Sequence, residues 1–186
     1  MDLLLQYLIN NGIHKEFALE LIHHFTLKKY PKKSLILSMG ERTHTICFII
    51  KGLVRGYYIN KNGEEIIKCF SKENDWCCIY NMLTTSKSEY YIETLEDSIL
   101  AEIDVTVIKD LIDSSPELNK LYSSLITTEL IEKEKINLHF QSMNAKERYL
   151  LFVKDHTDLS LRVNQEYIAS YIGITKTSLS RLKKDL

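Results

Sequence analysis

The sequence predicts an α+β protein with a jelly-roll β-barrel near the N-terminus, one long helix, and a small helix-turn-helix domain at the C-terminus. Short runs of β-branched and aromatic residues broken by turn signals fill 26–103. A stretch compatible with one helix follows over 116–142, and 164–186 fits a pattern of helix, tight turn and helix. The expected boundaries are 1–113 for the barrel with its N-terminal helices, 114–142 for the long helix, and 143–186 for the helix-turn-helix domain.

The composition is that of an ordinary globular protein. Of 186 residues, 45% are hydrophobic and 26% are charged, and the formal net charge is -1. After Gln141, however, eight basic residues stand against five acidic ones. The chain starts with an acid, Asp2, where a signal peptide needs a basic segment, and no apolar run is long enough to span a bilayer. We therefore expect a cytoplasmic protein with no membrane partner and a locally basic C-terminal end.

The first hundred residues predict two short helices followed by strands. Apolar residues at helical spacing indicate helices over 3–10 and 15–25, separated by Gly12. The pair Asn62-Gly63 separates LVRGYYIN from EEIIKCFS and predicts a hairpin with a type I′ turn, since that turn needs positive φ at both central residues. About eight strands of this even spacing indicate a jelly roll or a small barrel.

Local capping signals then predict two helices in succession. Asp104 can cap a short helix over VTVIKDLI, and Ser115-Pro116 can start the long one. A broken apolar stripe follows this long helix: Leu118, Leu121, Leu125, Leu130 or Ile131, and Ile136. A second copy of the same helix is the simplest partner for such a stripe, which predicts a homodimer. Packing of the first half of the helix on its own domain is the alternative.

A capping box predicts where the C-terminal domain begins. Asn144 precedes Glu147 by three residues, at the start of AKERYLLFVKDH. Tyr149, Leu150 and Val153 are spaced for burial in that helix. The following SLRV, residues 160–163, is expected to be a short strand.

The stretch NQEYIASYIGITKTSLSRLKKDL predicts the helix-turn-helix itself. Asn164 and Thr175 can cap its two helices, and Gly173 permits the turn. The apolar positions expected to be buried are Ile168, Ala169, Ile172, Leu179 and Leu182. The candidate DNA-binding residues are Thr175, Lys176, Thr177, Ser180, Arg181 and Lys184. Short polar and long basic side chains suit base edges and phosphates, so the expected partner is double-stranded DNA; a merely solvated basic face is the alternative.

Two segments resemble the CRP/FNR family of bacterial transcription regulators: CFIIKGLVRGYYINKNGEE in the barrel and QEYIASYIGITKTSLSR near the end. The resemblance covers essentially the whole chain and implies a cyclic-nucleotide-binding-like barrel, a dimer and DNA binding. It also implies that Lys176, Thr177 and Arg181 read bases and that Thr175 contacts a phosphate. Family members often carry arginine and glutamate where Lys176 and Thr177 stand, so we expect a different operator. Many relatives continue into a β wing beyond the position of Leu186, so some phosphate contacts are expected to be missing.

The resemblance also bears on the effector. Cyclic-nucleotide-binding members hold the phosphate with a glycine-glutamate pair and an arginine-serine pair. Here the first pair falls on Cys78-Ile79, or on Cys77-Cys78 after a one-residue slip, and the second falls near Ser88-Glu89. A buried phosphate without the arginine is costly, so we expect no tight cyclic AMP binding and an unidentified effector, if there is one. Lys87 could supply charge only if the loop shifts, and it lacks the planar fork of arginine.

The sequence gives little support for metal or enzyme chemistry. The four cysteines, Cys47, Cys69, Cys77 and Cys78, lack C-x-x-C spacing and are expected to be reduced, partly buried thiols. His44, His139 and His156 are scattered. No nucleophile elbow, phosphate loop or carboxylate pair stands in a recognisable motif. We expect a non-enzyme without cofactor or metal; the alternatives are a ligand-binding or protein-interaction module that does not read DNA, and a metal-dependent enzyme built on the barrel.

Overall fold

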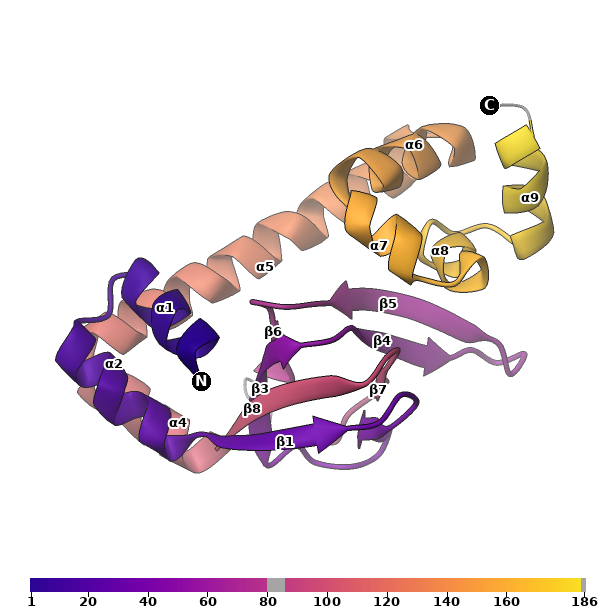
Figure 1. Cartoon of the computed structure of the whole chain (residues 1–186). Helices are drawn as coiled ribbons and strands as arrows, with labels where there is room; N and C mark the ends of the chain where they lie inside the picture. The colour runs from indigo at the N-terminus through magenta and orange to yellow at the C-terminus, as the bar shows by residue number, and fades with distance from the viewer. Residues whose placement is uncertain (80–85, 185–186) are drawn as a thin grey trace. The chain divides into compact units, whose positions relative to one another are not determined.

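The computed structural model describes residues 1–79 and 86–184 (Figure 1). The chain divides into two compact units, each made of two segments. The first unit comprises Met1–Tyr58 and Cys69–Leu125, and the second comprises Ile59–Lys68 and Ile126–Leu186.

The described helices and strands follow the predicted order. The helices are α1 (Asp2–Asn10), α2 (Lys15–Leu21), the 3-10 turn η1 (Ile22–His24), α4 (Val105–Ser114), α5 (Pro116–Ser142), α6 (Ala145–Asp155), α7 (Thr157–Arg162), α8 (Gln165–Tyr171) and α9 (Lys176–Lys184). The strands are β1 (Thr26–Tyr30), β2 (Leu35–Leu37), β3 (Thr45–Lys51), β4 (Val54–Ile59), β5 (Glu65–Ser71), β6 (Trp76–Cys77), β7 (Tyr91–Thr94) and β8 (Ser98–Asp104). The α+β class and the long helix are confirmed.

The described strands form two four-stranded sheets, in the orders β1-β8-β3-β6 and β2-β7-β4-β5. The pairs β1–β8, β3–β8, β3–β6, β2–β7 and β4–β7 are antiparallel. Neighbours in the sheets are mostly distant in sequence, which is the topology of a jelly roll rather than of a simple meander. The predicted barrel architecture is therefore confirmed.

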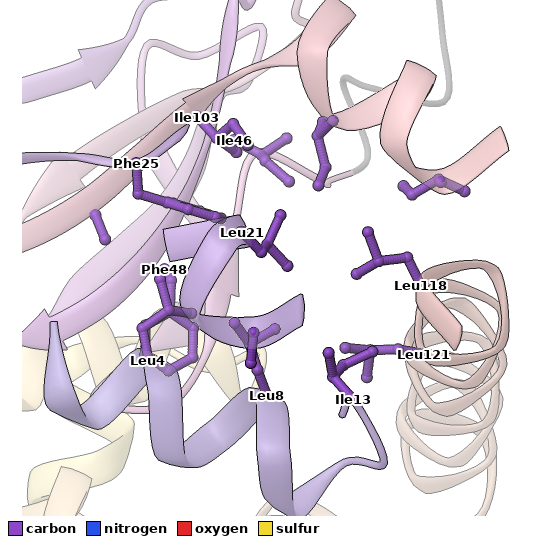
Figure 2. Close-up of a cluster of buried hydrophobic side chains, with 14 residues drawn as sticks. Leu4, Leu8, Ile13, Leu21, Phe25, Ile46, Phe48, Ile103, Leu118 and Leu121 are labelled. Atoms are coloured by element: carbon purple, nitrogen blue, oxygen red, sulfur yellow. The ribbon is translucent and has the colours of Figure 1, made fainter. Parts of the chain in front are cut away.

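Two clusters of buried side chains hold the first unit together. In one, Leu4 of α1 lies beside Phe48 of β3, and Leu8 of α1 lies toward Leu118 and Leu121 of α5 (Figure 2). The other cluster draws buried side chains from strands of both sheets: Leu37, Cys47, Ile49, Val54, Cys77, Ile92 and Leu100. The first half of α5 thus packs on its own domain, as the sequence alternative allowed.

The β4–β5 hairpin is present, but its turn differs from the prediction. Gly63 has φ +81, whereas Asn62 is not among the described residues with positive φ, so the turn is not type I′. The Gly63 amide donates to the Asn60 carbonyl (3.0 Å), and the Asn60 side-chain oxygen accepts from the amides of Asn62 (2.9 Å) and Glu64 (3.0 Å). A turn followed by a left-handed glycine is the usual three-residue hairpin loop. The Asn60 side chain therefore closes a longer loop than the Asn-Gly pair alone predicts.

Both predicted helix starts around the domain junction are confirmed. The Asp104 carboxylate accepts hydrogen bonds from the amides of Thr106 (2.7 Å) and Val107 (3.4 Å) and from the Thr106 hydroxyl. The bond from the Thr106 hydroxyl contributes most to lowering the pKa of Asp104, and the amide bonds lower it further. The Ser115 hydroxyl accepts from the Leu118 amide (3.3 Å) at the start of α5. These caps satisfy amides that have no partner within the helix.

The second half of α5 carries exposed apolar residues among charged ones. Leu130, Ile131 and Leu138 expose 62%, 48% and 59% of their surface in the single chain. The stripe predicted from the sequence is therefore buried at Leu118 and Leu121 and uncovered further along the helix.

Two expectations for the C-terminal domain are wrong. SLRV is not a strand, because Ser160, Leu161 and Arg162 form the second half of α7 and only Val163, its C-cap, is extended. The sheets of the described residues include no strand after β8, so an isolated strand would leave its backbone groups unpaired, whereas a helix pairs them internally. Leu150 is largely exposed, and Phe152 is the buried residue of α6 instead.

The capping box at the start of α6 is confirmed and gives a first testable prediction. The Asn144 side chain accepts from the amides of Lys146 (2.9 Å) and Glu147 (3.1 Å), and the Glu147 carboxylate accepts from the Asn144 amide (2.8 Å). We expect Asn144→Ala to lower the free energy of unfolding by about 1 kcal/mol, measured by chemical denaturation. Asn144→Asp is the control and should lose much less, because it keeps the accepting oxygen. Equal losses in both variants would contradict a capping role.

Candidate nucleic-acid interface

The predicted helix-turn-helix is formed by α8, a tight turn and α9. Ile168, Ala169 and Ile172 are buried on the α8 side, and Leu179 is buried on the α9 side. Leu182 is only half-buried. The Ile174 amide donates to the Ala169 carbonyl (2.9 Å) and closes the turn. The buried apolar positions are those expected from the sequence, except that Leu182 is partly exposed.

Glycine is required at the turn for two reasons. Gly173 has φ +75, a conformation that residues with a Cβ rarely adopt. A Cβ at this position would also lie 2.6 Å from Cε1 of Phe140, near the end of α5. The turn is therefore seated directly against the Phe140 ring.

Arg148 holds this turn in place, a role that the sequence did not reveal. Its Nε donates to the Ile172 carbonyl (2.9 Å), and its Nη1 donates to the Met143 carbonyl (2.6 Å). Its guanidinium carbon also lies 4.9 Å from the centre of the Phe140 ring, within the range of a cation–π contact. A residue counted among the basic surface charges thus links the end of α5 to the end of α8.

The two predicted caps of the helix-turn-helix differ in outcome. The Thr175 hydroxyl accepts from the Ser178 amide (3.1 Å), so the cap of α9 is confirmed. The Asn164 side chain makes no capping hydrogen bond in the described structure, so that part of the prediction is wrong. The Asn164 backbone nevertheless occupies the cap position, where its carbonyl accepts from the amides of Tyr167 (3.0 Å) and Ile168 (3.1 Å).

All six candidate residues are exposed: Thr175, Lys176, Thr177, Ser180, Arg181 and Lys184. Thr175 caps α9, and the other five stand at i, i+1, i+4, i+5 and i+8, a spacing that places them on one face of the helix. Leu179 is buried on the other side. Lys176 Nζ lies 3.7 Å from Glu166 Oε2, but both side chains are more than 60% exposed, so this ion pair is weak and easily exchanged. The structure thus gathers the candidate residues into one accessible basic and polar face.

The residues that stand where the family's second phosphate-binding pair would fall, near Ser88-Glu89, already have partners in part. Ser88 is buried; its hydroxyl donates to the Tyr90 carbonyl (2.7 Å), and its amide donates to the Glu41 carbonyl (2.7 Å). Its neighbours Lys87 and Glu89 are exposed. Residues 80–85, which lie between the two predicted pairs, fall outside the described residues.

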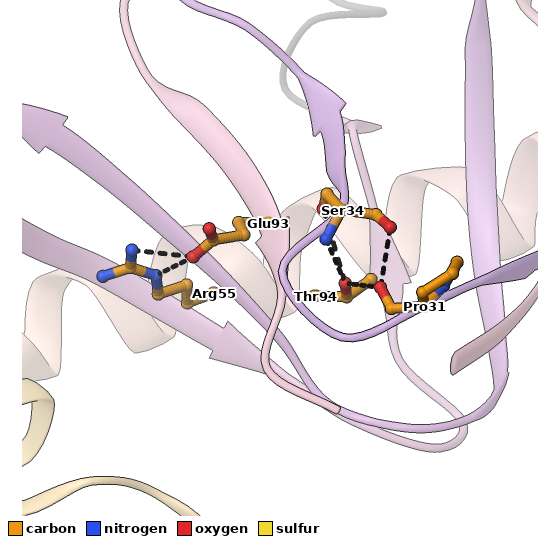
Figure 3. Close-up of polar contacts among 5 residues, drawn as sticks. All are labelled: Pro31, Ser34, Arg55, Glu93 and Thr94. Carbon is orange, nitrogen blue, oxygen red and sulfur yellow. Dashed lines mark hydrogen bonds and ion pairs between the residues drawn. The ribbon is translucent and has the colours of Figure 1, made fainter. Parts of the chain in front are cut away.

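A buried ion pair in the barrel was not foreseen from the sequence. Arg55 of β4 is 3% exposed, and its Nε and Nη2 both lie 2.7 Å from Oε2 of Glu93, its register partner on β7 (Figure 3). The Arg55 guanidinium also lies 4.0 Å from the centre of the Tyr57 ring. Nearby, the Thr94 hydroxyl donates to the Pro31 carbonyl (2.7 Å) and accepts from the Ser34 amide (2.9 Å). Each of these polar groups has a partner, as groups with little access to solvent need.

A cluster of thiols was not foreseen either. The sulfur atoms of Cys47, Cys77 and Cys78 all lie within 4.8 Å of one another, and the three residues are buried. Hydrogen bonds from Cys47 and Cys77 lower the pKa of Cys78, whereas hydrogen bonding to Cys47 and Cys78 together with burial raises the pKa of Cys77. Cys69 is half-buried and lies outside the cluster. All four cysteines are free, as expected from the sequence, and three of them are buried, but the sequence did not predict that these three lie together.

Comparison with known proteins gives consistent matches. Residues 27–115 match the family model of the cyclic nucleotide-binding domain. The chain is 24% identical over 166 residues to the "Anaerobic regulatory protein" of Haemophilus influenzae, covering 83% of this chain and 64% of that protein. It is 22% identical over 176 residues to the "cAMP-activated global transcriptional regulator CRP" of Salmonella typhimurium, covering 89% and 84%. The chain thus spans less than two thirds of the length of the first of these relatives.

Solved structures match the same architecture. FixK2 from Bradyrhizobium japonicum superposes with a TM-score of 0.78 at 18% identity, covering 87% of this chain and 84% of that chain. The c-di-GMP responsive global regulator CLP of Xanthomonas campestris superposes with a TM-score of 0.77 at 14% identity, covering 92% and 91%.

The part of the chain that matches the cyclic nucleotide-binding domain model, residues 27–115, is followed by the long helix α5 and by a C-terminal helix-turn-helix. In sequence and fold the chain is a relative of the CRP/FNR transcription regulators, which confirms the resemblance predicted from the sequence. Among the described residues, no helix is both long enough and apolar enough to cross a membrane.

Proposed function

We propose that this chain is a transcription regulator of the CRP/FNR type that binds double-stranded DNA through α9. The observation that carries the proposal is the single exposed face formed by Lys176, Thr177, Ser180, Arg181 and Lys184. Leu179 buries the opposite side of the helix, so this face is free to enter a major groove. The relatives named as regulators support the same function.

The residues of this face have different roles in the proposed complex. Lys176 and Thr177 stand at the N-terminal end of α9 and Arg181 stands one turn later, so these three would reach base edges. Thr175 and Lys184 lie at the two ends of the helix and would contact phosphates, with Ser180 between them. The ion pair between Lys176 and Glu166 is exposed and weak, so Lys176 can leave it to contact DNA while water solvates Glu166.

The functional unit in this proposal is a homodimer. The apolar residues Leu130, Ile131 and Leu138 lie on the second half of α5 and are exposed in the single chain. A second copy of α5 would cover them about a two-fold axis. Two recognition helices related by that axis would read half-sites about 34 Å apart on a near-palindromic operator.

We further propose that cyclic AMP does not control this regulator. The Ser88 hydroxyl is already used inside the loop, and its exposed neighbours are the cation Lys87 and the anion Glu89. An effector would act by binding one arrangement of the dimer more tightly than the other. As a DNA-binding regulator the chain would act in the cytoplasm, and it would not be an enzyme.

Selection from random duplex DNA with the purified full chain, sequenced at two salt concentrations, tests the function. We expect enrichment of two half-sites with two-fold symmetry and weaker binding at the higher salt, because phosphate contacts release counterions. Failure to enrich any sequence at either salt concentration would favour a protein-interaction or ligand-binding module instead.

A single substitution tests the assignment of α9. We expect Arg181→Ala to lower the affinity for the selected operator by about 1–3 kcal/mol and to relax the preference at one base position of each half-site. Lys154→Ala is the matched control, since Lys154 is an exposed cation on α6 outside the proposed interface. Fluorescence anisotropy with the operator and a scrambled duplex measures both variants. An unchanged preference in Arg181→Ala would contradict its role in reading bases.

A further inference from the structure

Three cysteine side chains meet inside the barrel at a point that the proposed DNA contact does not use. Cys47 of β3 and Cys77 of β6 are register partners on neighbouring antiparallel strands. Cys78 follows directly after β6, and all three sulfur atoms lie within 4.8 Å of one another. The three residues are buried, whereas Cys69 stands apart from them.

The backbone at Cys78 makes this convergence possible. Consecutive residues of a strand point to opposite faces, so two adjacent cysteines would ordinarily present their thiols on opposite sides. Cys78 has φ +68, one of three non-glycine residues with positive φ among those described. This conformation is unfavourable for a residue with a Cβ. It interrupts the alternation of side chains between the two faces of the sheet, so that the Cys78 thiol lies on the same side as those of Cys47 and Cys77.

The surroundings of the three thiols are mostly apolar, although the Thr43 side chain is hydrogen-bonded to Cys78. They belong to a buried cluster with Leu37, Ile49, Val54, Ile92 and Leu100. The nearest carboxylate in register is Glu102 of β8, which is paired with Cys47 across the sheet. Lys28 Nζ lies 2.8 Å from the Glu102 carboxylate, and the Tyr30 hydroxyl donates to it. The charge of Glu102 is therefore compensated by Lys28, and the thiol cluster faces an environment that disfavours additional net charge.

We propose that Cys47, Cys77 and Cys78 form a binding site for one thiophilic ion in three-coordinate thiolate geometry, of the trivalent metalloid class represented by arsenic(III). Thiolates select soft ions. Arsenic(III) binds three thiolates in a pyramid, in which sulfurs about 2.3 Å from the ion lie roughly 3.5 Å apart, so a cluster within 4.8 Å has to contract by up to about 1 Å.

Charge balance favours a trivalent ion over the other soft ions. Three thiolates around a trivalent ion sum to zero, whereas they leave one negative charge with zinc(II) and two with copper(I). Burying an uncompensated charge among Leu37, Ile49 and Leu100 is costly. Zinc(II) also prefers four ligands, and the Glu102 carboxylate is already engaged by Lys28 and Tyr30.

The binding reaction is balanced without any oxidant or reductant. Arsenous acid, As(OH)₃, exchanges three As–O bonds for three As–S bonds. Each departing hydroxide takes the proton of one thiol and leaves as water, so three waters are released and arsenic stays trivalent. The site does not require that the chain bind DNA, and its test below is independent of any operator.

The test is a titration of the full-length chain, reduced with a phosphine, with sodium arsenite. Equilibrium dialysis with elemental analysis should give saturable binding of one arsenic per chain, and X-ray absorption at the arsenic edge should show three sulfur neighbours and no oxygen. Thermal melting should show a higher Tm in arsenite, since the ion binds the folded barrel. No saturable binding, fewer than three sulfur neighbours, or uptake of copper(I) but not of arsenite would overturn the proposal.

Serine variants locate the site. Cys47→Ser, Cys77→Ser and Cys78→Ser should each lose the one-equivalent binding and the rise in Tm, while Cys69→Ser should keep both. Circular dichroism shows whether each variant is folded. If a variant is unfolded, the sulfur count in the wild-type complex still decides the outcome. Arsenite binding that survives in folded Cys47→Ser or is lost in folded Cys69→Ser would contradict the assignment.

Discussion

Arg55→Met is expected to lower the free energy of unfolding by about 3 kcal/mol, because it leaves a largely buried carboxylate without its partner. The Arg55 side chain is 3% exposed and that of Glu93 is 15% exposed, so solvent cannot replace the lost ion pair. Two nitrogens of the guanidinium lie 2.7 Å from the same oxygen, and the contact with the Tyr57 ring is lost as well. Methionine keeps much of the volume of the arginine side chain, so the decrease in the free energy of unfolding is caused mainly by removal of the positive charge.

Chemical denaturation at neutral pH measures this effect, with two further variants as controls. Arg55→Met combined with Glu93→Gln should recover much of the lost stability, since no unpaired charge remains. Lys135→Met removes a cation from an ion pair of the same length, 2.7 Å to Glu132, but with side chains 56% and 53% exposed. It should cost less than about 1 kcal/mol. Similar small losses in Arg55→Met and Lys135→Met would show that burial does not increase the contribution of the Arg55–Glu93 ion pair to the free energy of unfolding.

Local signals explain why the helices could be predicted. The Asp104 and Asn144 side chains accept hydrogen bonds from amides two or three residues further along the chain, so both partners of each bond are close in sequence. Pro116 begins α5 where its missing amide costs nothing. The exposed face of α9 follows from helical spacing and from the burial of Leu179 alone. The residues on the exposed face of α9 could therefore be predicted from the sequence, whereas the contacts that position the turn before α9 could not.

Features that depend on strand register could not be predicted in the same way. Arg55 and Glu93 are 38 residues apart, and they meet only because β4 and β7 pair in one particular register. Cys47 and Cys77 likewise meet only through the pairing of β3 with β6. A shift of one residue would turn each side chain to the other face of its sheet, and the sequence pattern alone does not select among pairings.

Contacts between helices were missed for a similar reason. Phe140 lies under Gly173, and Arg148 bonds to the Ile172 carbonyl, although each pair is more than 20 residues apart. Arg148 is one of the eight basic residues that follow Gln141, and basic side chains usually are exposed. Its planar guanidinium instead satisfies two carbonyls and stacks on a ring. Charge counts thus overstate the basic surface of this domain by one residue that is committed to structure.

The combined change Ile131→Glu and Leu138→Glu is expected to convert the proposed dimer into a monomer. The two residues are seven apart on α5, which places them on one stripe, and both are largely exposed in the single chain. The monomer fold should therefore survive, whereas two pairs of glutamates facing each other across the two-fold axis would repel. Because the second half-site would no longer be tethered, affinity for the two-half-site operator should fall by at least about a hundredfold.

Light scattering after gel filtration measures the oligomeric state, and anisotropy with the selected operator measures the affinity. Asn137→Glu is the control, because Asn137 is exposed on α5 about a third of a turn away from this stripe; it should stay dimeric and keep its affinity. A double variant that remains a dimer would place the subunit contact elsewhere than on the exposed half of α5. A monomeric double variant with unchanged affinity would instead show that one recognition helix suffices, and would contradict the proposed reading of two linked half-sites.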